Sequence, residues 1–286
     1  MDKYACLHAR VLAASSRLAI ELIAPAAASE ADLLRVHCPN YVARMLSGEV
    51  TEAQMRRIGF PWSLAMVERS RRSSGGTIAA LRAAIGGDRV AVNLAGGTHH
   101  AAFDRGGGYC VFNDAVIAAR NVQHDGLAGR VLIVDLDVHQ GDGSALLCAN
   151  DANIYTFSMH AERNYPANKP PSDLDVALPS GTDDARYLDS LAHWLPIALE
   201  RAQADAVIYL AGADPYIGDR LGLLAMSKPG LAQRDRMLLA AAQRMSLPTA
   251  ICMAGGYAND VDDIVDIHFA TVSMAAAFAR IADAAL

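Results

Sequence analysis

The chain has 286 residues, of which 52% are hydrophobic and 20% charged, and its formal net charge is −6. This length and composition are typical of a globular protein with a buried core, and the negative charge argues against a nucleic-acid surface. No run of about eighteen apolar residues occurs, so we expect no membrane span. The five cysteines are scattered without a C-x-x-C pair, which indicates reduced thiols and a cytoplasmic protein.

The first sixty or so residues have a mostly helical pattern, including an amphipathic helix expected over residues 11–22. After them, short apolar runs alternate with longer helical patterns, which is typical of a parallel sheet covered by helices on both faces. The expected strands cover residues 89–94, 130–136, 153–158, 206–210 and 248–253. The expected helices cover residues 76–85, 114–124, 185–204, 231–245 and 263–284. The basic residues of segment 69–72 are expected at a solvated helix end.

These elements predict a single α/β domain over residues 1–286, a three-layer αβα arrangement with a mostly parallel central sheet. Glycines and polar residues follow four of the expected strands at once, in the segments GGTHH, DVHQGDG, GAD and GGY. Ligands of open parallel sheets bind at the carboxyl ends of the strands. We therefore expect a catalytic cleft where these four segments meet.

The second of these segments carries ionisable groups inside a buried run. Asp135, Asp137 and His139 would share one face of an extended chain, and such a cluster needs a cation to neutralise it. Asp137 and His139, with Asp214 from another strand end, would form the three-ligand shell of a catalytic zinc site. Iron(II), cobalt or manganese would accept the same ligands. An ordinary hydrogen-bonded pair of Asp137 and His139 is the alternative, which the convergence of the other segments disfavours.

The other strand ends carry residues suited to proton transfer. His99 and His100 follow a Gly-Gly turn, and an imidazole suits a general base that takes a proton from water and returns it to a leaving amine. Asp135 and Asp142 are acids that could orient these rings. Tyr257 follows two glycines, which would let its hydroxyl donate a hydrogen bond to a carbonyl oxygen as charge develops.

The segments GGTHHA, GYCVFNDAVIAA, VDLDVHQGDG, FSMH, LAGADPYIGD and MAGGYA together resemble the histone deacetylase family of zinc-dependent deacylases, and most closely its short bacterial members similar to class IV. The resemblance runs from about residue 3 to the C-terminus and implies the arginase/deacetylase fold. The resemblance implies that the zinc ligands are Asp137, His139 and Asp214. It implies that His99 and His100 are the catalytic histidines, with His100 as the general base, and that Asp135 and Asp142 support them. It also implies that Tyr257 polarises the carbonyl group of the substrate.

The resemblance also implies a tunnel for the acyl-lysine chain and a second cation. Its tunnel and substrate residues are Gly108, Tyr109, Tyr165, Gly255 and Gly256, and its potassium site, formed largely by backbone carbonyls, is made by Asp135, Asp137, His139, Ser158 and Met159. The sequence departs from the family pattern in several places. Gln140 stands where many relatives have histidine, and tyrosines replace the phenylalanines common in the tunnel. The chain begins just before KYACLHAR, so we expect the preceding rim loop of relatives to be missing.

Together these features predict a metal-dependent amidohydrolase that removes acyl groups from acylated lysine side chains of peptides or proteins. Zinc is the expected catalytic metal, with iron(II) possible, and potassium the expected structural ion. An acetylpolyamine amidohydrolase and a catalytically impaired binder of acylated ligands are the alternatives. A two-manganese ureohydrolase is disfavoured, because Asp214 lacks the D-x-x-D spacing of that chemistry. The sequence predicts neither a nucleic-acid nor a membrane partner, and it leaves the oligomeric state open.

Overall fold

Six parallel strands form the centre of the computed structural model, which describes residues 2–283. The strands are β1 (Val90–Asn93), β2 (Val131–Asp135), β3 (Ile154–Ala161), β4 (Leu174–Leu178), β5 (Ala206–Leu210) and β6 (Thr249–Cys252). They lie in the order β1-β6-β5-β2-β3-β4, and every neighbouring pair is parallel. The predicted α/β fold with a parallel central sheet is therefore confirmed.

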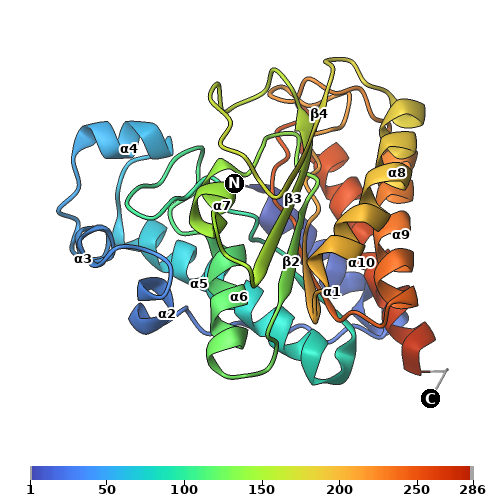
Figure 1. Cartoon of the computed structure of the whole chain (residues 1–286), viewed down its shortest axis with the longest axis horizontal. Helices are drawn as coiled ribbons and strands as arrows, with labels where there is room; N and C mark the ends of the chain where they lie inside the picture. Colours follow the sequence, from blue (N-terminus) through green and yellow to red (C-terminus); the bar gives the residue numbers. More distant parts are fainter. Residues whose placement is uncertain (1, 284–286) are drawn as a thin grey trace.

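Helices cover both faces of this sheet (Figure 1). On one face lie α1 (Asp2–Leu18), α8 (Asp184–Ala202), α9 (Lys228–Arg244) and α10 (Val261–Asp283). On the other lie α5 (Leu64–Ala83), the short π-helix η1 (Ala84–Asp88), α6 (Asp114–His124) and α7 (Asp142–Cys148). The short helices α2 (Glu30–Leu34), α3 (Pro39–Ser47) and α4 (Glu52–Ile58) extend this second side. No helix among the described residues is long and apolar enough to cross a membrane.

The alternation of side chains along β2 explains the two layers. All five residues of this strand are buried. Leu132 and Val134 join the apolar cluster beneath α8 and α9, whereas Val131 and Ile133 join the cluster beneath α5 and α6. Successive side chains of a strand point to opposite faces, so a strand buried on both faces must be apolar throughout.

Strand β4 is missing from the expected elements. Its sequence LDVAL buries Leu174, Val176 and Leu178 but exposes Asp175 and Ala177. β4 forms one edge of the sheet, where a single face is covered. A short alternating run of this kind is a weak pattern beside the continuous apolar runs of the central strands. The five strands that were expected are confirmed, with ends that differ by up to three residues.

The expectation of a helix end at segment 69–72 is wrong. Helix α5 continues through this segment and through the two glycines that follow it. A Cβ on Gly75 would lie 1.9 Å from the carbonyl oxygen of Ala26, and one on Gly76 would lie 2.7 Å from Asn93 Oδ1. These glycines therefore allow close packing of α5 against its neighbours. The expected last helix agrees with α10, except that residue 284 lies outside the described residues.

Candidate active site

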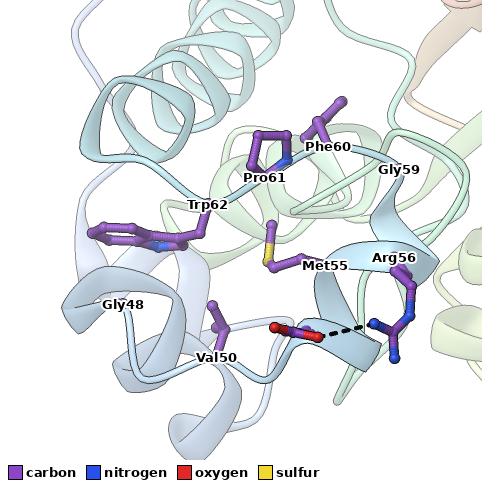
Figure 2. Close-up of a pocket in the computed structure, with 9 residues that line it drawn as sticks. Gly48, Val50, Met55, Arg56, Gly59, Phe60, Pro61 and Trp62 are labelled. Carbon is purple, nitrogen blue, oxygen red and sulfur yellow. Dashed lines mark hydrogen bonds and ion pairs between the residues drawn. The ribbon is translucent and has the colours of Figure 1, made fainter.

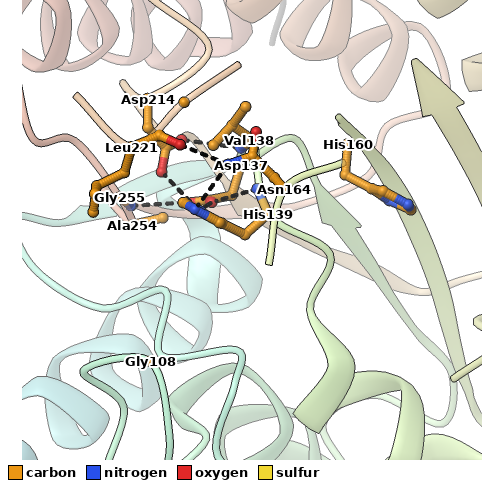
Figure 3. A network of polar contacts seen from close by, with 12 residues as sticks. Gly108, Asp137, Val138, His139, His160, Asn164, Asp214, Leu221, Ala254 and Gly255 are labelled. Atoms are coloured by element: carbon orange, nitrogen blue, oxygen red, sulfur yellow. Dashed lines mark hydrogen bonds and ion pairs between the residues drawn. The ribbon is translucent and has the colours of Figure 1, made fainter. Parts of the chain in front are cut away.

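The three predicted metal ligands meet at the carboxyl ends of β2 and β5, which are neighbours in the sheet. One ligand atom from each of Asp137, His139 and Asp214 lies within 4.8 Å of the others. His139 Nδ1 is 3.0 Å from Asp137 Oδ1 and 3.3 Å from Asp214 Oδ2. Figure 3 shows the three side chains directed at one another, whereas His160 lies apart.

The chemistry of this cluster fits a divalent metal. Asp137 and Asp214 are 1% and 0% exposed, and Asp214 Oδ2 accepts no well-aligned hydrogen bond within the described chain. Burial and the charge of Asp137 raise the pKa of Asp214 to about 7. Two buried carboxylates beside one imidazole are costly unless a cation lies between them. Three such ligands form the usual protein shell of a catalytic zinc site, and iron(II) accepts the same set.

Backbone amides hold the carboxylates in place. The N–H of Val138 donates to Asp214 Oδ1 at 3.0 Å, and the N–H of Gly255 donates to Asp137 Oδ2 at 2.8 Å. A Cβ on Gly255 would lie 1.9 Å from Asp214 Oδ2, so no other residue fits this position. Gly255, predicted as part of the substrate site, therefore contacts the metal-ligand carboxylates themselves.

The two adjacent histidines each contact a separate carboxylate. His99 Nδ1 lies 2.6 Å from Asp135 Oδ2, and His100 Nδ1 lies 2.6 Å from Asp142 Oδ1. Burial alone would lower the pKa of His99, but Asp135 and Asp137 raise it to about 9. Burial and the nearby charge of His99 lower the pKa of His100 to about 4. His100 is therefore the neutral ring of the pair at neutral pH, and its Nε2 lies 3.1 Å from His99 Nε2.

The N-terminus of α6 holds the loop that carries these histidines. Asp114 accepts hydrogen bonds from the N–H groups of Gly97 and Thr98 at 3.0 and 2.6 Å, and from Thr98 Oγ1 at 2.5 Å. Asn113 Nδ2 donates to the carbonyl oxygen of Ala101 at 3.1 Å. Neither Asn113 nor Asp114 was predicted to support the site, although an Asn-Asp pair before a helical pattern is a capping signal.

Tyr257 is positioned by contacts that are remote in sequence. Lys3 Nζ donates to the carbonyl oxygens of Ala254 and Gly256 at 3.3 and 3.2 Å, and it lies 5.2 Å from the centre of the Tyr257 ring. Asp219 Oδ2 accepts from the N–H of Tyr257 at 2.5 Å. Burial raises the pKa of Tyr257, so its phenol stays protonated and can donate. Lys3 was not predicted, because a lysine near the start of a helix carries no local signal.

Residues 1–272 match the family model described as the histone deacetylase domain. The chain belongs to the histone deacetylase family. It is 44% identical over 268 residues to an uncharacterized protein of Picosynechococcus sp., a match that covers 94% of this chain and 89% of that protein. It is 34% identical to histone deacetylase 2 of Arabidopsis thaliana, over 82% of this chain and 63% of that protein.

Histone deacetylase 1 of Oryza sativa is 28% identical, over 83% of this chain and 49% of that protein. The chain thus spans about half to two thirds of the length of these named histone deacetylases. The crystal structure of the HDA15 HD domain has a TM-score of 0.80 and 21% identity, covering 96% of this chain and 83% of that chain. This structural likeness confirms that the chain has the fold of the family.

The residues expected to line the tunnel lie around the histidine and tyrosine. Gly108 passes directly over His100, because a Cβ there would lie 2.4 Å from His100 Cδ2. The Tyr165 ring stands 4.8 Å from the His100 ring at 85°, and the Tyr109 ring lies 5.6 Å from the Tyr257 ring. Tyr109 and Tyr165 are both 47% exposed, which places them at the entrance to the site.

The residues expected to bind potassium lie where β2 meets β3. Asp135 is paired in register with Ser158, and Ser158 and Met159 are both buried. Ser158 Oγ lies 2.9 Å from His160 Nδ1, so its hydroxyl already has one partner. The structure thus brings these residues together, and the ion itself stays a prediction.

Two cavities lie outside the metal-ligand cluster. One, between α4 and the loop after it, is lined by Met55, Phe60 and Trp62, with the Glu52–Arg56 ion pair at its edge (Figure 2). The other, of about 1460 Å³, runs from Tyr257 along β1 to α10 and is mostly apolar. Neither cavity is lined by a predicted metal ligand. The larger cavity nevertheless reaches the candidate active site, because Tyr109, Gly256 and Tyr257 line it.

Proposed function

We propose that this protein is a zinc-dependent deacylase that removes acyl groups from acylated lysine side chains. Its family and fold are those of deacetylase-like hydrolases. The observation that carries the proposal is the meeting of a three-residue metal-ligand cluster with two histidine–carboxylate pairs at one edge of the sheet. Tyr257 follows β6, the strand beside β5, and would supply a hydrogen-bond donor to the same site.

Asp137, His139 and Asp214 would hold zinc, with iron(II) as the alternative metal. Zinc bound there would supply a Lewis acid for the attacking water and the acyl carbonyl. Potassium beside Asp135 and Ser158 would neutralise part of the negative charge beneath the cluster. Its role would be structural, because it would lie in a buried part of the sheet.

His100 acts as the general base. Its neutral ring accepts a proton from the attacking water at Nε2 while Asp142 holds the Nδ1–H. The water oxygen bonds to the acyl carbon, and the bond from this carbon to the lysine nitrogen then breaks. The proton held by His100 passes to the leaving amine, so the products are a carboxylic acid and free lysine.

Tyr257 stabilises the charge that develops on the acyl oxygen. Its phenol remains protonated at neutral pH, because burial raises its pKa. A donor aimed at this oxygen typically contributes about a hundredfold or more to the rate. The rings of Tyr109 and Tyr165 would contact the methylene chain of the lysine as it enters. Acylated lysine, as a long apolar stem with a terminal amide, suits an entrance lined by two aromatic rings.

Metal analysis and a panel of acyl-lysine peptides test this proposal. We expect about one zinc per chain at the cluster, hydrolysis of acyl-lysine peptides, and loss of hydrolysis after treatment with a chelator. A folded protein that binds no metal and hydrolyses no peptide would contradict it. Competition between acetylspermidine and an acetyl-lysine peptide distinguishes an acetylpolyamine amidohydrolase from an acyl-lysine deacylase. Binding of the peptide without turnover would identify the non-catalytic alternative.

We also propose that residues 1–286 form one catalytic domain and that the protein acts in the cytoplasm. The match to the family model over residues 1–272 supports a single unit. The cysteines of the described residues are all free, which suits a reducing compartment. Fractionation of the native cells, followed by immunodetection, tests the location.

A further inference from the structure

Arg234, in the middle of α9, reaches the ends of both strands that carry the metal-ligand residues. It is 0% exposed. Its Nη1 donates to the carbonyl oxygen of Gly212 at 2.7 Å and to that of Leu136 at 3.3 Å. Leu136 directly precedes Asp137, and Gly212 lies two residues before Asp214. One guanidinium therefore spans the two chain segments from which these carboxylates project.

These two carbonyl groups lie at the point where the ladder between β2 and β5 ends. The last registered pair of the ladder is Asp135 with Leu210. Buried carbonyl oxygens need a donor, and beyond this pair the sheet no longer supplies one in regular succession. Arg234 Nη1 donates to both carbonyl groups, and the contact of Nε with Asp235 orients the planar guanidinium, so that Nη1 is held between the two segments.

A network of buried polar groups holds Arg234 in this position. Asp235 Oδ1 accepts from Arg234 Nε at 2.9 Å and from the hydroxyl of Tyr209 at 2.5 Å. Asp235 Oδ2 accepts from Thr271 Oγ1 at 2.6 Å, which ties the network to α10. Tyr209 belongs to β5 itself. The guanidinium is thus anchored from three elements before it contacts the strand ends.

A buried ion pair is seldom more stabilising than apolar residues of similar volume. Core stability alone therefore does not account for a fully buried Arg-Asp pair at this place. The direction of the guanidinium, toward the residues next to Asp137 and Asp214, indicates what it contributes. Residues that orient metal ligands from behind commonly affect metal affinity about tenfold or more when they are removed.

We propose that Arg234 is a positioning residue for the metal centre, which fixes the spacing of the segments at Leu136 and Gly212 so that Asp137 and Asp214 converge on one ion. This inference rests on the proposed function in one respect, namely that Asp137, His139 and Asp214 hold a metal. It does not depend on the substrate or on turnover. Asp235 acts through Arg234, by orienting its guanidinium.

Zinc affinity of the metal-free protein tests this directly, by competition with a chromophoric chelator. We expect Arg234→Met to weaken zinc binding about tenfold or more and to reduce the rise in melting temperature that zinc produces. The absorption spectrum of the cobalt-loaded variant should also change, because the spectrum reports ligand geometry. Arg234→Lys, which keeps the charge but not the planar group that Asp235 orients through Nε, should recover part of the affinity.

Leu238→Ala is the matched control, since Leu238 lies one turn further along α9 and is 2% exposed. It should lower the melting temperatures of the metal-free and zinc-loaded forms alike and leave zinc affinity unchanged. If the role of Arg234 is purely structural, Arg234→Met will also lower both melting temperatures and leave zinc affinity unchanged, and this result would overturn the inference. If Arg234→Met does not fold, wild-type zinc affinity in Arg234→Lys overturns it instead.

The outcomes for this inference and for the proposed function are distinguishable. A wild-type protein that binds zinc tightly but hydrolyses no acyl-lysine peptide contradicts the function and leaves the role of Arg234 in place. A wild-type protein that hydrolyses peptides, with an Arg234→Met variant of unchanged zinc affinity, contradicts only the role of Arg234. A wild-type protein that binds no zinc contradicts both.

Discussion

The Nε2 atoms of His99 and His100 lie 3.1 Å apart. Two positive imidazolium rings at this distance repel one another, so the pair favours a state in which one ring is charged and the other neutral. The partners of the two rings decide which is which: Asp135, with Asp137 nearby, raises the pKa of His99, whereas burial and the charge of His99 lower that of His100. In the mechanism that we propose, the neutral ring of His100 is the base and the charged ring of His99 is not.

This division predicts unequal effects of replacing the two histidines. His100→Ala should lower kcat on an acyl-lysine peptide by about a hundredfold or more, because it removes the proposed general base. His99→Ala should lower kcat less, since His100 keeps its contact with Asp142. Both variants should keep their bound zinc. Steady-state kinetics with metal analysis checks this, and a larger loss in His99→Ala would reverse the assignment.

Tyr257→Phe removes only the hydroxyl. We expect kcat to fall by about a hundred- to a thousandfold, because the developing charge on the acyl oxygen loses a donor. KM, zinc content and melting temperature should stay close to those of the wild type. Kinetics and calorimetry on the same preparation provide the measurement. Substantial turnover by the variant would show that Tyr257 is not the donor.

Asp114→Asn weakens the link between α6 and the histidine loop. The amide offers only one accepting oxygen to the donors of Gly97 and Thr98, so we expect a loss of about 1–3 kcal/mol in the free energy of unfolding. Activity should fall further than this loss of stability explains, because the loop carries both histidines. Urea unfolding and kcat at a temperature well below the transition measure the two effects.

Asp125→Asn is the control for this variant, since Asp125 caps the other end of α6 and forms a partly exposed ion pair with Arg82. Such surface pairs contribute about 0–1 kcal/mol. The control should therefore leave both stability and kcat nearly unchanged. Equal effects of the two substitutions would mean that Asp114 does not act on the loop.

We expect the protein to lose stability in mild acid because of His37. Burial lowers its pKa to about 4, and its ring is 0% exposed, with Nδ1 2.8 Å from the carbonyl oxygen of Ala102. Above the pKa of His37 in the unfolded protein, about 6.5, the ring is neutral in both the folded and the unfolded state, and its contribution to stability is fully present. As the pH falls toward 4, His37 binds a proton in the unfolded state but not in the folded state, so the free energy of unfolding falls by up to about 3 kcal/mol.

His37→Leu should remove this share of the pH dependence. The variant will be less stable at pH 7, because the N–H of Asn113 loses its acceptor on the ring. Its unfolding free energy should nevertheless decline less steeply than that of the wild type as the pH falls from about 6.5 to about 4. Urea titrations at several pH values give both slopes. Parallel slopes would contradict the assignment of this titration to His37.

Local patterns account for much of what the sequence predicts correctly. The apolar runs of β2 and β5 are continuous, because strands covered on both faces must be apolar throughout. Asp137, His139 and Asp214 stand out because ionisable groups beside buried runs need a cation or another partner. The edge strand β4 lacks this signal, since only its alternate residues are buried.

The sequence by itself determined the type of fold and the residues that meet at the strand ends, because period and composition act over a few neighbouring positions. Only the tertiary structure decided what holds those residues in place. Lys3 contacts Gly256 across 253 positions, and Arg234 contacts Leu136 across 98. A hydrogen bond between such positions depends on how whole layers pack, and no local pattern of residues encodes that packing.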